Sequence, residues 1–160
     1  MTLLQNALER LAAIEIEALA GLSTPVTADA VPYMIHTQEA FPYFTHRAGT
    51  ISIDSDSHDI DVYEVEVVAR LVIGHVTDGY HGQPESQLYT YLPAVIAAIN
   101  ARELLQSAAY PAALDGLVQA RATGSSGLRI YETAGIQTRQ VGTEITVVCT
   151  FADDLTQEYL

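Results

Sequence analysis

A regular alternation of side chains over residues 60–73 is the feature that most constrains the fold. From Tyr63 on, the side chains that share one parity are all apolar, and they are Tyr63, Val65, Val67, Ala69, Leu71 and Ile73. Successive side chains of a strand point to opposite faces, so this pattern predicts a β-strand with one buried face. The other parity carries Glu64, Glu66 and Arg70 among valines, which suits either solvent or a polar contact with another subunit.

A similar alternation closes the chain over residues 139–151. Its apolar positions are Val141, Ile145, Val147, Cys149 and Phe151. Before it, turn residues at 123–127 separate two short apolar runs, 116–122 and 128–132, which predicts a β-hairpin. Cys149 is the only cysteine, so an internal disulfide is excluded, and we expect its thiol to be buried.

Two amphipathic helices complete the pattern. The first is predicted over residues 2–20, with Thr2 and Gln5 as a capping box and Gly21 as the stop signal. The second has Leu92, Val95, Ile96 and Ile99 as its buried stripe, and Pro93 suits its first turn. We therefore predict one α+β domain over residues 1–151, in which two main helices pack on one face of an antiparallel or mixed sheet. Residues 152–160 should form an acidic, mobile tail.

The segment 23–50 contains prolines and reads as irregular, with an edge strand possible at residues 31–35. Its aromatic residues Tyr33, Phe41, Tyr43 and Phe44 suit core packing or a subunit interface, where aromatic side chains are enriched. We predict that one part of this segment, residues 31–44, is an interface element. A second predicted contact surface is formed by Glu64, Glu66 and Arg70.

Charge limits the classes of partner. The chain has 160 residues and a formal net charge of −13, with seven arginines and no lysine. Binding to a phosphate backbone needs a cationic face, so coating of nucleic acid is not expected, although DNA can pass through an acidic pore. The sequence contains no apolar run long enough for a membrane span, and no secretory signal is expected.

The search for catalytic and metal-binding motifs finds little. Acidic residues and one histidine gather in residues 54–61, but the central glycine and final glutamate of an EF-hand loop are missing there. His75 and His81 share a loop with Asp78, without metal-site spacing. Neither a nucleophile elbow nor a phosphate loop is present. We expect no catalytic residue, metal or cofactor.

The layout as a whole resembles the tail-terminator, or tail-completion, proteins of long-tailed phages. The resemblance covers most of the chain. It rests on the starting helix around residues 4–8, the proline-broken segment, the strand 63–73, the helix 92–105 and the closing phrase Gln140-Val141-Gly142-Thr143-Glu144-Ile145-Thr146-Val147.

This resemblance implies a virion structural protein and not an enzyme. Members of the family form a hexameric ring that caps the tail tube and receives the head connector, so the implied partners are other copies, the tube protein and the connector. The implied location is the virion neck, after assembly in the host cytoplasm. Alternatives are another neck or head-completion subunit, a small metal-dependent enzyme using residues 54–61, and a small-molecule-binding domain using the aromatic segment.

Overall fold

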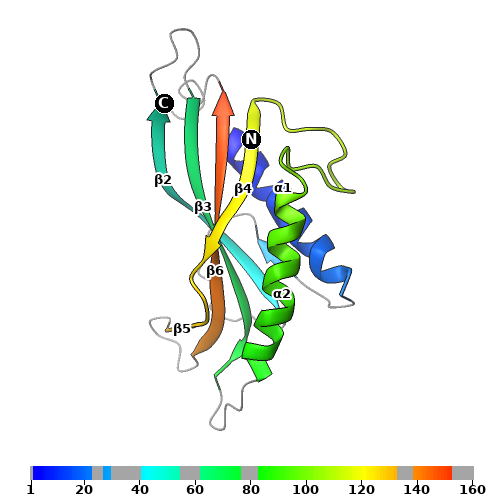
Figure 1. Cartoon of the computed structure of the whole chain (residues 1–160), viewed down its shortest axis with the longest axis vertical. Coiled ribbons are helices and arrows are strands. Elements are labelled where there is room, and N and C mark those ends of the chain that lie inside the picture. Colours follow the sequence, from blue (N-terminus) through cyan, green and yellow to red (C-terminus); the bar gives the residue numbers. More distant parts are fainter. Residues whose placement is uncertain are drawn as a thin grey trace.

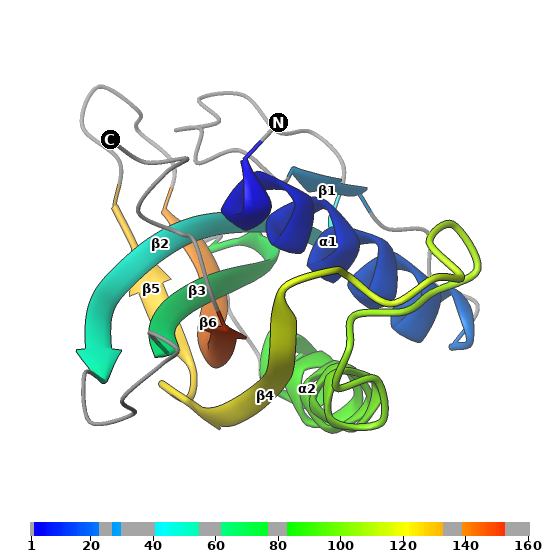
Figure 2. The same cartoon turned by 90° about the horizontal axis from the view of Figure 1, so that it is seen from above.

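The computed structural model describes residues 2–22, 27–29, 41–54, 62–76, 83–132 and 139–152. Two helices, α1 (Leu3–Ala20) and α2 (Gln83–Asn100), pack against strands of one sheet. The strands are β1 (Thr27–Asp29), β2 (Tyr43–Asp54), β3 (Val62–His75), β4 (Leu117–Ser125), β5 (Arg129–Tyr131) and β6 (Gln140–Ala152). The predicted α+β class is confirmed, and Figures 1 and 2 show both helices on one side of the sheet.

The sheet order is β1-β2-β3-β6-β4, and β5 pairs with β6 beside this path. All the pairings are antiparallel except that of β1 with β2. The strand β6 therefore lies between β3 and β4, although it follows both in the chain. The predicted hairpin between residues 116–122 and 128–132 is wrong, because both β4 and β5 pair with β6.

Helix α1 begins as its sequence predicts. The Thr2 hydroxyl accepts a hydrogen bond from the Gln5 amide, and the Gln5 side chain accepts one from the Thr2 amide. Gly21 ends the helix, but with a right-handed φ of −60° rather than the left-handed conformation that glycine typically supplies there. Helix α2 begins at Gln83, so Pro93 lies in the interior of the helix. The prediction that Pro93 lies in the first turn is therefore wrong.

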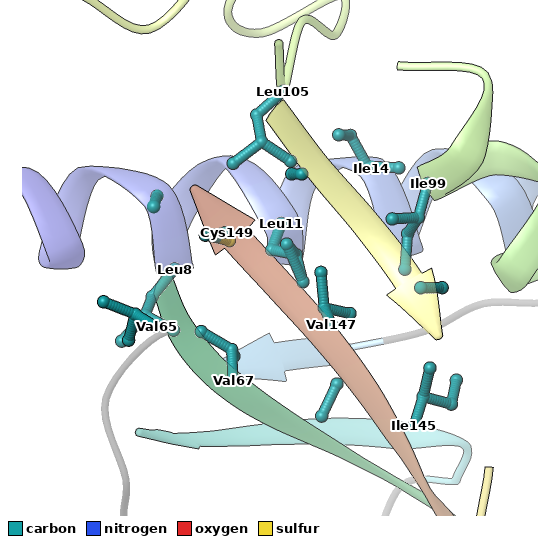
Figure 3. Packing of buried hydrophobic residues seen from close by; sticks show 14 of the residues in the cluster. Leu8, Leu11, Ile14, Val65, Val67, Ile99, Leu105, Ile145, Val147 and Cys149 are labelled. Atoms are coloured by element: carbon teal, nitrogen blue, oxygen red, sulfur yellow. The ribbon is translucent and has the colours of Figure 1, made fainter. Parts of the chain in front are cut away.

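The core lies between the helices and the sheet (Figure 3). Leu8, Leu11 and Ile14 of α1 face the strands, and Ile99 of α2 joins them. The predicted apolar parity of β3 is buried throughout, and in β6 the same holds for Ile145, Val147, Cys149 and Phe151. Cys149 is a buried free thiol, as predicted, and burial raises its pKa to about 12.

Residues 43–50 differ most from the prediction. The sequence predicts an irregular segment there, but these residues form the first part of the twelve-residue strand β2. The possible edge strand at residues 31–35 lies outside the described residues, as does the tail after Ala152. Ala152 itself belongs to β6, and its amide donates to the Gly116 carbonyl.

Candidate functional site

The sheet face that points away from the helices is the candidate contact surface, and we call it the open face. On β3 it carries Glu64, Glu66 and Arg70, which the alternation predicted to share a face. Glu64 is exposed, whereas Glu66 and Arg70 are half-buried. Val68 and Val72 lie on the same face and are buried, so the valine positions of this face are shielded by their neighbours.

Arg70 is held in a fixed position. Its guanidinium donates to Glu144 Oε1 from Nη2 at 2.9 Å and from Nε at 3.3 Å. The same oxygen lies 3.6 Å from Nη2 of Arg47 on β2. The guanidinium carbon of Arg70 also lies 4.1 Å from the ring centre of Tyr131. Two cations and one carboxylate thus form a network across β2, β3 and β6, which limits the freedom of Arg70 to reach a ligand.

Tyr43 lies opposite Val72 at one end of this face. It is buried, and its hydroxyl donates to Gln140 Oε1 at 2.9 Å. Burial raises the pKa of Tyr43, and the Gln140 bond and Arg70 partly oppose the shift. Burial also raises the pKa of Tyr131, and the nearby Glu144 carboxylate adds to that effect. Both phenols are therefore neutral at physiological pH.

The aromatic residues of the predicted interface differ in their burial in the structure. Phe44 lies on β2, is fully buried and belongs to the core under α1. Phe41 is half-buried; its ring meets His75 edge-on at 4.7 Å and lies 5.6 Å from Tyr43. Tyr33 lies outside the described residues. Tyr43 and Phe44 are buried within this chain, so in this conformation their side chains leave little surface for a partner.

A buried acid–histidine pair links α1 to β2. His46 Nε2 lies 2.8 Å from Oε2 of Glu15, and both side chains have no solvent-exposed area. The second carboxylate oxygen of Glu15 has no hydrogen-bond partner within the described ranges. Because neither side chain has solvent-exposed area, a substrate cannot reach the pair in this conformation. We interpret it as a structural contact between helix and sheet.

Metal binding was the other chemistry considered. Within the described part of the chain, no group of three His, Cys, Asp or Glu side chains could hold a metal ion. Of the acidic run 54–61, only Asp54 falls in that part, at the end of β2. His75 ends β3, whereas Asp78 and His81 lie outside the described residues.

Two features of these surfaces are absent from the sequence-based prediction. The Glu144 partner of Arg70 depends on the strand register, which a pattern within one strand cannot reveal. The second feature is a pair of exposed isoleucines, Ile51 and Ile53, which alternate with Thr50 and Ser52 on β2. That alternation is typical of a strand, but the prolines of the preceding segment favour an irregular structure.

Comparison with known proteins adds no assignment. No protein-family model matches the chain. No curated protein matches it either. Neither of the two helices that the structure describes is long and apolar enough to span a membrane.

Proposed function

We propose that this chain is a virion structural subunit of the tail-terminator type, which assembles into a ring on the tail tube and joins it to the head connector. The support is the layout of the fold. A capped helix begins the described chain, β3 and β6 form the middle of the sheet, and α2 covers the same face as α1. These are the elements on which the resemblance to that family rests.

The observation that carries the proposal is the open face. In the described part of the chain no helix covers it, yet it is structured by the Arg47–Glu144–Arg70 network. A fixed pattern of charge on a broad sheet surface favours a specific protein partner, because matched potentials set the register of a contact. Cyclic rings need such a surface to meet a different surface of the next copy.

The test is the mass of the assembled protein. Six copies of a 17.3 kDa chain give roughly 104 kDa for a closed ring. We expect this mass by light scattering, for the protein alone or bound to tail tubes, and a ring in electron micrographs. A chain that stays monomeric under both conditions overturns the proposal.

A matched pair of variants locates the ring contact. Glu64→Lys with Glu66→Lys reverses charge on the open face and should prevent ring closure while the protein stays folded. Asp115→Lys, at an exposed position in the loop before β4, changes charge away from that face and should leave the ring intact. If both variants form normal rings, the open face is not the contact surface.

A further inference from the structure

The two edges of the sheet differ in how their backbone groups are used. At the β4 edge, the amide of Ala120 donates to the Glu103 carbonyl at 2.7 Å. The amide of Ala122 donates to Asn100 Oδ1 at 2.9 Å. Both acceptors lie at or just after the end of α2, so this segment covers the edge. These two amides of β4 are therefore not available to a further strand.

The β2 edge is open over most of its length. Strand β1 pairs only with Tyr43, Phe44 and Thr45. Beyond them, residues 47, 48 and 51–53 pair with β3 on one side, with a bulge at residues 49–50, and have no second strand among the described residues. Every residue of 47–53 is exposed. A strand with unpaired N–H and C=O groups is a template for another strand, and natural proteins usually block it with charge or a covering element.

Two large apolar side chains mark this open edge. Ile51 pairs with Val65 and Ile53 pairs with Tyr63, so both point to the face on which the helices pack. Nevertheless they are 53% and 61% exposed. The end of β2 lies at the side of the sheet away from both helices (Figures 1 and 2). Unpaired backbone and uncovered isoleucines thus coincide at one place along β2.

We propose that β2 is an edge through which two copies of this chain pair, antiparallel and about a two-fold axis at Ser52. In this register Ile51 of one copy lies directly opposite Ile53 of the other, and the reverse also holds. Because both side chains point to the same face, the contact brings all four isoleucines together. The two sheets become one continuous sheet across the axis.

The charge distribution favours a second copy as the occupant. The chain has a formal net charge of −13, so most surfaces of two copies repel one another. Residues 48–53 read Ala-Gly-Thr-Ile-Ser-Ile and contain no charged group, and Asp54 follows them. In the register about Ser52, Asp54 of one copy lies opposite Thr50 of the other, so no carboxylate within residues 50–54 stands directly opposite another. A β2–β4 contact is disfavoured, because Glu103 and Asn100 already accept hydrogen bonds from two amides of β4.

The experiment compares the full chain with two variants that add the same charge. Ile51→Lys with Ile53→Lys places charge on the open edge. Val118→Lys with Ile130→Lys places it at residues of β4 and β5 that are 52% and 56% exposed. Native mass spectrometry gives the number of subunits, circular dichroism gives the melting temperature, and hydrogen exchange reports on the backbone amides of residues 47–53.

We expect an even number of subunits in the wild type and in the Val118/Ile130 variant. The Ile51/Ile53 variant should show half that number with an unchanged melting temperature. In the wild type, dilution should accelerate amide exchange at residues 47–53 and not in β4. A monomeric wild type, or an edge variant that keeps the wild-type mass, overturns the proposal.

This inference does not depend on the ring function, and the experiments can refute either proposal without refuting the other. A ring that is lost in the Glu64/Glu66 variant but unaffected by the Ile51/Ile53 variant supports the ring and refutes edge pairing. A plain dimer that is abolished only by the Ile51/Ile53 variant supports edge pairing and leaves the ring without support. If the edge variant does not fold, the dilution dependence of exchange in the wild type decides.

Discussion

The pair formed by Glu15 and His46 is the most costly single contact to disturb. Both side chains are fully shielded from solvent and meet at 2.8 Å. Removing one partner leaves a buried polar group without its hydrogen bond, whereas replacing both by apolar groups avoids that penalty.

We therefore expect His46→Leu to destabilise the protein by about 1–3 kcal/mol, the cost of leaving a buried hydrogen-bonding group without its partner. Glu15→Leu with His46→Leu should cost less than the sum of Glu15→Leu alone and His46→Leu alone. Urea unfolding of the single and double variants measures this coupling. Additive losses would mean that the two groups do not interact energetically in the folded protein.

The buried Tyr43 and the half-buried Tyr131 make stability depend on alkaline pH. An unfolded tyrosine ionises near pH 10, about its ordinary pKa. Burial raises the pKa of Tyr43 and of Tyr131 in the folded protein. Their contribution to stability is therefore complete below about pH 10 and is lost as the pH rises through the folded values.

Unfolding free energy measured from neutral to strongly alkaline pH checks this sign. We expect a decline above about pH 10 in the wild type and a shallower one in Tyr43→Phe, which cannot ionise there. Phenolate absorbance should appear later in the folded protein than in denaturant. If stability rises across this range, the assigned direction is wrong.

Among the strands, β6 depends on one glycine. Gly142 pairs with Val72 of β3 and Arg129 of β5. A Cβ atom added there would overlap the carbonyl oxygen of Leu71 and approach the Cα of Val72. Only a residue without a side chain fits between the strands, so the closing phrase of the sequence carries a packing requirement.

Gly142→Ala should therefore destabilise the fold by about 1–3 kcal/mol, as overpacked sites do. Gly124→Ala is the matched control, because a Cβ at Gly124 meets nothing within 4 Å. Thermal melting of both variants separates steric overlap from a general effect of alanine. Equal melting temperatures for the two would contradict the close approach at Leu71.

Prediction from sequence succeeded where one strand or helix carries its own signal. The period of two in β3 and β6 and the capping box of α1 need no knowledge of tertiary contacts. The sequence pattern does not reveal the first part of β2, because its buried positions include the polar His46, which lies against Glu15 in the folded protein. The false hairpin has a similar cause: β4 and β5 are adjacent in sequence, but each finds its partner in β6.

The candidate surfaces were predictable only in part. The alternation placed Glu64, Glu66 and Arg70 on one face, and the structure agrees. It could not show that Arg70 is bound by Glu144, because that contact joins strands far apart in the chain. Nor could it separate Phe44, which the core buries, from Phe41, which stays half-buried, since both belong to one aromatic cluster in the sequence.

For the molecule as a whole, the position of β6 determines when the fold can exist. Val62 pairs with Ala152, and every residue of β6 follows the other strands of its sheet in the chain. During synthesis β3 and β4 are therefore both completed before β6, the strand that pairs with each of them. The entropy lost on closing so long a loop must be overcome before the contacts between these strands form, which slows folding. Until residues 140–152 emerge, the nascent chain exposes apolar strands, and stalled translation products should be the form most prone to aggregate.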